Sequence, residues 1–270
     1  MARRSRHVLA LLPAAALALA GCATSTDTGS GSSGDSGVKL VKDGKLITCT
    51  HLSYEPFQYS EGDKTVGFDV DLVDLVAKKL NVKQEILDTA FEGIQNGQSL
   101  NVGDCDLAAA AMTITDDRKK AIDFSDPYFD AEQALLVKKD TGIKDLAALK
   151  GKKIGVQQAT TGEIYANDNK AKYGYEVVQF EDLTLQETAV RTGAIDAAIN
   201  DNGPLYKYAK TFPDTEVTTE FPTGDKYGIG VKKGNKALLD TINAVLKDAK
   251  SSGKYDEIYE KWFGKKPSSK

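Results

Sequence analysis

The stretch MTITDDRKKAIDFSDPYF, residues 112–129, decides what fold and site we expect of this chain. Thr115 has the properties of a helix N-cap, because its hydroxyl can accept a hydrogen bond from a free N–H two or three residues later. Asp116 and Asp117 then occupy the first turn, where the helix dipole favours negative charge. Arg118 follows at the third helical position, where a capping box would place Glu or Gln. A cation at that end of a helix is unfavourable, so Arg118 needs a reason outside the helix.

The segments around this stretch alternate between strand and helix patterns. Strands are expected at 45–52, 82–89, 105–112 and 134–139, and helices at 68–81 and 91–100. A second unit begins near residue 132, with strands expected near 149–157, at 175–180, 195–201 and 215–221, and helices near 160–169, at 185–193 and 204–212. Two further helices, broken at Ser252-Gly253, end the chain. This alternation predicts α/β units with mostly parallel sheets covered by helices.

The first 22 residues are predicted to be a lipoprotein signal peptide that is not part of the fold. Three arginines within the first six residues precede the apolar run VLALLPAAALALA, which is too short for a confident membrane span. The run ends in LAGC, residues 19–22, which resembles the bacterial lipobox and implies lipidation of Cys22. The alternative is an ordinary signal peptide with an unrelated cysteine.

Residues 23–43 are expected to form a flexible tether, because ATSTDTGSGSSGDSG has almost no apolar side chains. A lipid and a tether would hold the folded part on the extracytoplasmic face of a bacterial cell membrane. The 270-residue chain has 35 Lys and Arg and 39 Asp and Glu; without the three leader arginines the net charge is 32 − 39 = −7. That charge disfavours nucleic acid or an anionic surface as a partner.

Two cysteines remain after Cys22, namely Cys49 and Cys105, and both fall in predicted strands of the first unit. An oxidising compartment and an even count favour a disulfide between them. Two separate buried thiols are the alternative.

Arg118 and Asp201 each follow a predicted strand, in different halves of the chain. Ligands of open α/β sheets bind beyond the carboxyl ends of the strands. A guanidinium offers a planar fork that suits a carboxylate, and an aspartate can receive an ammonium. A free α-amino acid carries both groups, which makes it a candidate ligand. The alternative is a solvated arginine on one helix and an N-cap aspartate on another.

Five motifs in order resemble the family 3 extracellular solute-binding proteins, the amino-acid receptors of ABC importers. They are SYEPFQY, VGFDVDLVDLVAKKL, AAMTITDDRKKAIDFSDPYF, GVQQATTG and GAIDAAIND, and the resemblance covers about residues 44–264. It implies a two-lobed periplasmic-binding-protein-like fold, with two mostly parallel sheets flanked by helices and a hinge of two crossovers. Lobe 1 would comprise residues 44–130 plus 226–266, and lobe 2 residues 131–225.

The resemblance also assigns roles to residues. Tyr54 would stack its ring on the ligand side chain, with Phe91 opposite. Arg118 would grip the α-carboxylate and Asp201 would receive the α-ammonium. Further contacts would come from the following residues: the hydroxyl and N–H of Thr113, the backbone carbonyl of Ala111, and the backbone N–H groups of the turn at Thr160 and Thr161.

Two more residues bear on the ligand side chain. His51 stands where relatives that bind cationic side chains often have an acid, so a polar or acidic side chain is expected; a histidine simply bonded near a strand end is the alternative. Gln157 could reach a side-chain amide or carboxylate. We therefore expect glutamine, glutamate, cysteine or cystine before a cationic amino acid.

The function expected is that of a monomeric receptor that captures a free amino acid and delivers it to ABC permease subunits. We expect no cofactor, no metal and no catalytic residue. An enzyme is the first rival, because a dehydratase shares this fold, but the mature chain has one histidine, His51, and no Ser-His-Asp set, Cys-His set or HExxH motif. A module that senses a ligand without transport is the second rival.

Overall fold

The structure is a computed structural model that describes residues 37–267 of the chain. The expected signal peptide, Cys22 and most of the expected tether lie outside these residues. Residues 37–43, at the end of that tether, contact the folded part: the N–H of Val41 donates to Asp106 at 2.6 Å. No helix within residues 37–267 is long and apolar enough to cross a membrane.

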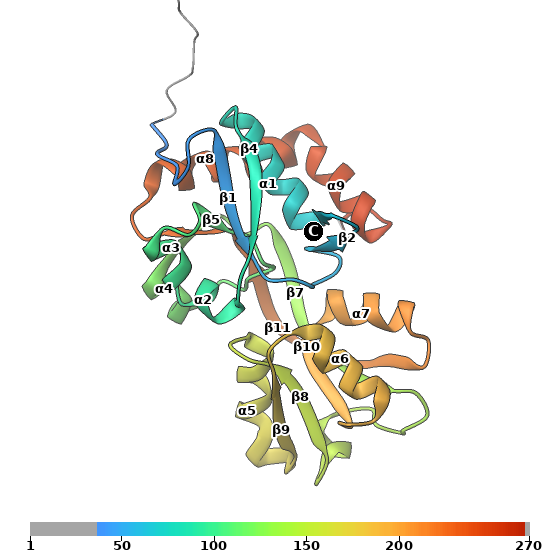
Figure 1. The fold of residues 1–270 in the computed structure, drawn as a ribbon. Coiled ribbons are helices and arrows are strands. Elements are labelled where there is room, and N and C mark those ends of the chain that lie inside the picture. Colours follow the sequence, from blue (N-terminus) through green and yellow to red (C-terminus); the bar gives the residue numbers. More distant parts are fainter. Residues whose placement is uncertain (1–36, 268–270) are drawn as a thin grey trace, which may run out of the picture. The chain divides into compact units, whose positions relative to one another are not determined.

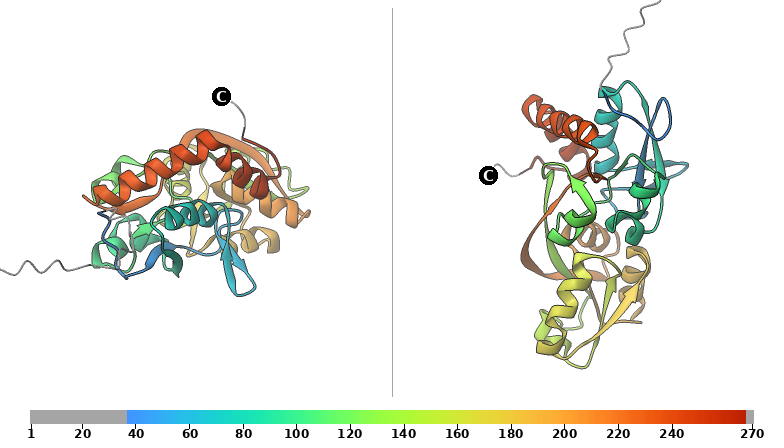
Figure 2. Two further views of the ribbon diagram at one scale, coloured as in Figure 1. Left: turned by 90° about the horizontal axis from the view of Figure 1, so that it is seen from above. Right: turned by 90° about the vertical axis from the view of Figure 1, so that its left-hand side faces the viewer.

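The first lobe is built on a five-stranded sheet (Figure 1). Its strand order is β4 (Lys83–Asp88), β1 (Lys45–Thr50), β5 (Leu107–Ala108), β12 (Gly230–Lys232) and β6 (Ile122–Phe124). Its helices are α1 (Phe68–Lys79), α2 (Phe91–Gln95), α3 (Gln98–Val102), α4 (Asp116–Ala121), α8 (Lys236–Ser252) and α9 (Lys254–Phe263). The C-terminal helices α8 and α9, drawn in red, lie beside α1 (Figure 2). The apolar face of α8 packs there, through Leu238, Ile242, Val245 and Leu246.

The second lobe is built on another five-stranded sheet. Its strand order is β11 (Thr215–Tyr227), β7 (Phe129–Lys138), β10 (Ala197–Asp201), β8 (Lys153–Gln157) and β9 (Glu176–Phe180), with helices α5 (Thr161–Tyr173), α6 (Leu183–Thr192), α7 (Asn202–Thr211) and a 3₁₀ turn, η1 (Leu146–Leu149). Side chains of β10 alternate between two cores: Ala197 and Ile199 pack with the α5 side, and Ala198 packs with the α6 and α7 side. Both faces of the sheet are therefore covered, and β10 ends at the site with Asp201.

These sheets confirm the expected two-lobed α/β fold, but they are mixed in direction and not mostly parallel as expected. In the first sheet β1 runs parallel to β4 and β5, whereas β12 runs antiparallel to β5 and β6. In the second sheet β8 runs parallel to β9 and β10, whereas β7 runs antiparallel to β10 and β11. The antiparallel pairs arise where the chain passes between the lobes, because β7 and β11 run in opposite directions.

The hinge consists of the long strands β7 and β11, which lie side by side between the lobes (Figure 1). Their pairing runs from Phe129 with Tyr227 to Lys138 with Thr215, and it is interrupted between Phe221 and Asp225. Two crossovers of this kind allow a hinge motion. The lobe boundaries near residues 131 and 225 stay a prediction.

An aromatic cluster fixes the first-lobe ends of both hinge strands. The ring centroid of Phe129 lies 4.9 Å from that of Phe57, 5.5 Å from that of Tyr227 and 5.2 Å from that of Phe263. Such pairs add to the free energy gained from burying the rings. Bending is therefore favoured beyond this cluster, where the interrupted pairing of β7 and β11 begins.

Some expected elements differ from the observed ones. The helix expected at 91–100 is two helices, because the chain turns at Gly97, which has a φ of 78°. The strand expected at 105–112 pairs only over β5, since the residues after it turn into the site at Ala111, with a φ of 47°. The segment between β1 and α1, for which no strand was expected, contains a hairpin, β2 (Tyr59–Glu61) and β3 (Lys64–Val66). Strands β6 and β12 were not expected; three residues are too few to show a periodic pattern.

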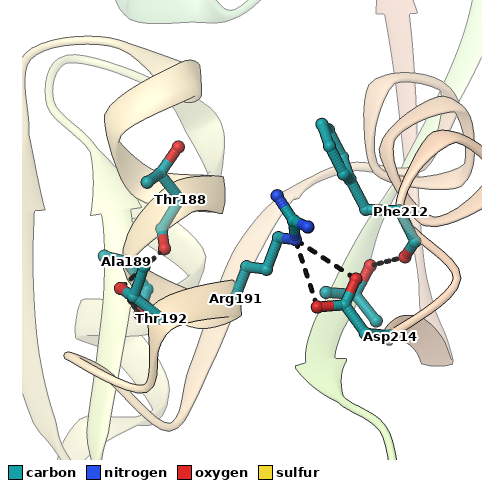
Figure 3. A network of polar contacts seen from close by, with 7 residues as sticks. Thr188, Ala189, Arg191, Thr192, Phe212 and Asp214 are labelled. Atoms are coloured by element: carbon teal, nitrogen blue, oxygen red, sulfur yellow. Dashed lines mark hydrogen bonds and ion pairs between the residues drawn. The ribbon is translucent and has the colours of Figure 1, made fainter.

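A polar contact ties the C-terminal end of α6 to the turn before β11 (Figure 3). The Nε of Arg191 donates to both carboxylate oxygens of Asp214, at 3.2 and 3.1 Å, and its guanidinium carbon lies 4.3 Å from the ring centroid of Phe212. Thr192 donates its hydroxyl to the Thr188 carbonyl at 2.9 Å. The ion pair is about half exposed, so it contributes little on its own. The pair links the end of α6 to the residue just before the hinge strand β11.

A disulfide joins Cys49 and Cys105, as the sequence predicted. Cys49 lies in β1, and Cys105 lies two residues before β5, the neighbouring strand. Both residues are buried, in an apolar cluster that includes Phe91 and Met112. The bridge therefore fixes the strand from which the chain enters the site.

We expect the double substitution Cys49→Ala, Cys105→Ala to lower the free energy of unfolding. The bridge closes a loop of 56 residues. Loop-closure entropy then gives about 4 kcal/mol of stabilisation. The check is guanidinium unfolding of the double variant and of the oxidised wild type, with dithiothreitol-treated wild type as a second comparison. An unchanged midpoint in both comparisons would show that the bridge does not stabilise the fold.

Candidate ligand-binding site

A cleft of about 330 Å³ lies between the two lobes. It is lined by His51, Tyr54, Gln58, Phe91, Ala110, Ala111, Thr113, Arg118, Gln157, Thr160, Thr161 and Asp201. All ten ligand-binding residues predicted from the sequence are among them, and Gln58 and Ala110 are additional. The structure thus brings the predicted residues together, and their binding roles stay a prediction.

Arg118 is buried in the cleft, with 5% of its surface exposed. Thr115 is the N-cap of α4, as predicted, and its hydroxyl accepts from the N–H of Arg118 at 3.2 Å. The guanidinium donates to the carbonyls of Thr113 at 2.8 Å and Ala159 at 3.0 Å, and more weakly to Gln95 at 3.4 Å. A guanidinium has five N–H groups. These three bonds leave two of them for a ligand.

Phe91 supports that guanidinium. Its ring centroid lies 5.2 Å from the guanidinium carbon of Arg118, which is within the range of a cation–π contact. Burial lowers the pKa of Arg118 to about 10, so the side chain stays charged at neutral pH. Phe91 therefore touches the arginine as well as lining the cleft, a contact that the expected stacking on a ligand did not include.

Asp69 holds the backbone at Ala111. Its carboxylate accepts from the N–H of Ala111 at 2.7 Å and from the hydroxyl of Tyr128 at 2.8 Å. Burial raises the pKa of Asp69 to about 7, against the opposing effect of these bonds. The φ of 47° at Ala111 is uncommon for a residue with a Cβ, so the carboxylate compensates a costly backbone conformation.

The second lobe presents the N-terminus of α5 to the cleft. Thr160 is its N-cap, and its hydroxyl accepts from the N–H of Glu163 at 3.2 Å. The first N–H groups of a helix have no partner within the helix. Those of Thr161 and Gly162 make no hydrogen bond within residues 37–267. A helix start with such free groups is suited to bind an anion.

Asp201 ends β10 and is buried, with 5% of its surface exposed. Its carboxylate accepts from the hydroxyls of Tyr54, at 2.9 Å, and Tyr227, and from the side-chain amide of Gln133. Burial raises the pKa of Asp201 to about 6, and the two tyrosine bonds oppose that rise. The same amide of Gln133 donates to Asp225 at 3.1 Å. Asp201 is thus an ionised acceptor at neutral pH.

A buried network of side-chain amides supports the position of Asp201. The hydroxyl of Tyr54 is also 2.7 Å from the side-chain oxygen of Asn200, whose amide donates to Gln186 of α6 at 2.9 Å. Gln186 in turn donates to the carbonyls of Gly155 and Ile199, each at 2.8 Å. Tyr54 comes from the first lobe and the amides from the second. The predicted stacking residue therefore also bonds across the cleft.

Gln133, Tyr227 and Gln58 were not predicted as site residues, and neither were the supporting residues Asp69, Gln186 and Asn200. Gln133 pairs with Asp201 in the register of β7 and β10, and Tyr227 ends β11. Their placement depends on strand pairing, which leaves no local pattern in the sequence. Gln58 lies within the SYEPFQY motif, four residues after Tyr54, and that spacing was the available signal.

Neither buried charge of the cleft forms an ion pair among the residues that the structure describes. The salt bridges in residues 37–267 involve other residues, most of them at least one-third exposed. Burying a charge is costly unless the charge is paired and hydrogen-bonded. Arg118 and Asp201 therefore fit a ligand that brings one charge of each sign. The same described residues contain no group of three or more His, Cys, Asp or Glu placed to hold a metal.

Comparison with known proteins supports one family. Residues 46–265 match the bacterial extracellular solute-binding proteins, family 3. The chain is 40% identical over 210 residues to the ABC transporter glutamine-binding protein GlnH of Bacillus subtilis, covering 75% of this chain and 74% of that protein. It is 32% identical over 267 residues to a probable histidine-binding protein of Neisseria gonorrhoeae, covering 96% of each.

The fold matches solved structures of the same kind. An ancestral arginine-binding protein bound to glutamine superimposes with a TM-score of 0.78 and 42% sequence identity, over 83% of this chain and all of that one. The family match spans most of the chain and agrees with the five motifs, the two sheets and the cleft. The chain therefore belongs to the bacterial extracellular solute-binding proteins, family 3.

Proposed function

We propose that this chain is an extracytoplasmic receptor that captures a free amino acid between its lobes and delivers it to an ABC importer. One observation carries the proposal: two opposite buried charges, Arg118 and Asp201, line one cleft and have no ion-pair partner among the described residues. The relatives support it, since they are named as binding proteins for glutamine and histidine, one of them explicitly of an ABC transporter.

The ligand would lie with its carboxylate on Arg118 and its ammonium on Asp201. The two free N–H groups of the guanidinium and the free N–H groups at Thr161 and Gly162 would donate to the carboxylate. Asp201 and the carbonyl of Ala111 would accept from the ammonium. A micromolar Kd corresponds to about −8 kcal/mol, which several charge-assisted bonds with aromatic cover can supply.

Ligand binding would shift the lobes toward closure. A ligand that contacts both walls binds the closed form more tightly, so it increases the population of that form. Contacts across the cleft in this structure indicate how the walls meet: Arg118 donates to the Ala159 carbonyl at 3.0 Å, and the hydroxyls of Thr113 and Thr161 are 3.4 Å apart. The closing lobes would then exclude water from the paired charges, which strengthens the electrostatic attraction within each pair.

The location and partners follow from the same proposal. We infer that Cys22 carries a lipid which, with the polar segment after it, holds the receptor as a monomer on the membrane near its permease. The family and its relatives act in binding and transport, and we propose no enzymatic activity. The side chain of the ligand was expected from the sequence to be polar or acidic.

A thermal-shift screen of the twenty amino acids tests the receptor proposal. A ligand at about a hundred times its Kd adds about 2.7 kcal/mol to the stability of the folded state. For a chain of this size that corresponds to a rise in Tm of roughly 5 to 10 °C. The receptor proposal would be abandoned if no amino acid raised the Tm and titration calorimetry also gave no heat.

Replacing Arg118 should abolish tight binding and leave the fold intact. We expect Arg118→Ala to raise the Kd of the best ligand by at least about a hundredfold, because the α-carboxylate loses a bidentate charged partner. The measurement is titration calorimetry, with circular dichroism to check folding. Arg191→Ala is the matched control, since it removes the same charge outside the cleft lining and should leave the Kd unchanged. Equal affinities of Arg118→Ala and wild type would refute the assignment.

Binding should weaken as Asp201 becomes protonated. Because burial raises the pKa of Asp201 to about 6, the carboxylate is charged above that pH and neutral below it. We expect the apparent Kd to be constant above about pH 7 and to rise about tenfold per pH unit well below 6. Asp201→Asn should bind weakly with a flat profile. A similar slope in that variant would assign the titration to a group other than Asp201.

A further inference from the structure

We propose that the side-chain end of the cleft selects a neutral side chain that carries N–H donors, a carboxamide in the first place, and rejects a carboxylate. This inference rests on the proposed function and names the class of amino acid. Its basis is a group of buried hydrogen-bond acceptors that belong to residues lining the cleft and receive no hydrogen bond from any residue in the described part of the chain.

His51 contributes the first acceptor. Its Nδ1 lies 3.0 Å from the carbonyl oxygen of Thr89, which can only accept, so Nδ1 carries the proton in the neutral ring. The other ring nitrogen, Nε2, then has a free lone pair. It is buried and has no partner within residues 37–267. The backbone of Thr89 therefore leaves this cleft-lining histidine with a buried, unpartnered acceptor.

Gln58 contributes the second acceptor. The residue is 1% exposed, and its side-chain N–H group points at the carbonyl of His51, at 3.4 Å. Exchanging its amide nitrogen and oxygen would bring two acceptors together, so this orientation is the favoured one. The side-chain oxygen is left buried, with no donor near it in the part of the chain that the structure describes. A ligand N–H group would satisfy it.

Gln157 completes the end of the cleft from the second lobe. Its side chain is 2% exposed, and its oxygen likewise receives no hydrogen bond from residues 37–267. A carboxamide has both a donor and an acceptor, and so does Gln157. It can therefore donate to the carbonyl of a ligand carboxamide while His51 and Gln58 accept from the ligand N–H groups.

Neither charge of the cleft is left to pair with a charged side chain of the ligand. Among residues 37–267, Arg118 and Asp201 are the only Lys, Arg, Asp and Glu residues in its lining. The zwitterionic part of any amino acid uses both of them. A cationic side chain would then lie among neutral acceptors without a counter-charge, and a carboxylate would meet acceptors where it needs donors. Burial of either charge without a partner is costly.

The direct test is titration calorimetry of the wild-type protein near neutral pH with glutamine, glutamate, arginine and the γ-methyl ester of glutamate. We expect glutamine to bind at least about a hundredfold more tightly than glutamate, because a site built for N–H donors rejects a ligand that lacks them. The ester is neutral and lacks the donors, so its weak binding would separate hydrogen bonding from charge. Arginine should also bind more weakly than glutamine.

The outcomes distinguish this inference from the receptor proposal. Glutamate, arginine or the ester binding as tightly as glutamine would overturn the selectivity proposed here and leave the receptor proposal standing. Binding of none of the twenty amino acids would overturn both.

Substitution of cleft residues tests which side chain determines the selectivity. His51→Phe keeps a ring and removes the acceptor, so we expect it to weaken glutamine binding at least about tenfold and to reduce the ratio of glutamine to glutamate affinity. Gln84→Leu is the matched control, because the carboxamide of Gln84 is also unpartnered within residues 37–267 but does not line the cleft. A ratio unchanged in His51→Phe, with both proteins folded by circular dichroism, would show that His51 does not read the side chain.

Discussion

The structure depends on the burial of two opposite charges in one cleft without an ion pair between them. Arg118 and Asp201 are each 5% exposed, and hydrogen bonds hold each of them in place. The guanidinium donates to two backbone carbonyls, and the carboxylate accepts from two tyrosine hydroxyls and an amide. Those bonds keep the groups charged but do not neutralise them. A zwitterion supplies the missing charges, which is why an amino acid explains the cleft better than a neutral solute would.

The hinge and the site share residues, and this links ligand binding to lobe motion. Gln133 belongs to β7 and Tyr227 to β11, the two strands that pass between the lobes, and both bond to Asp201. The aromatic cluster at Phe129 and Tyr227 restrains the first-lobe ends of these strands. An ammonium that binds Asp201 therefore acts on the group to which the moving strands are attached. A ligand can shift a conformational equilibrium only through such differential contacts.

The sequence predicted those features that depend on local patterns. The N-cap at Thr115, the end of a buried strand at Asp201 and the pairing of Cys49 with Cys105 all follow from residue type, position or cysteine count. The α/β class followed from the alternation of strands and helices, and the two-lobed fold from the resemblance that the five motifs carry. The mixed direction of the sheets and the positions of Gln133 and Tyr227 did not follow, because they depend on which strands pair and in which register. Short strands such as β6 and β12 lack the length that a periodic signal needs.

His51 shows why residue type alone does not fix specificity. From the sequence, an imidazole at this position was compatible with a polar or an acidic side chain. The carbonyl of Thr89 removes that ambiguity, because it assigns the ring proton to Nδ1 and leaves Nε2 to accept. Every amino acid makes the contacts of its α-carboxylate and α-ammonium, so these contacts provide affinity but do not discriminate between amino acids. Selectivity has to come from the atoms that contact the ligand side chain. In this cleft those atoms are the acceptors of His51 and Gln58 and the amide of Gln157, which can both donate and accept.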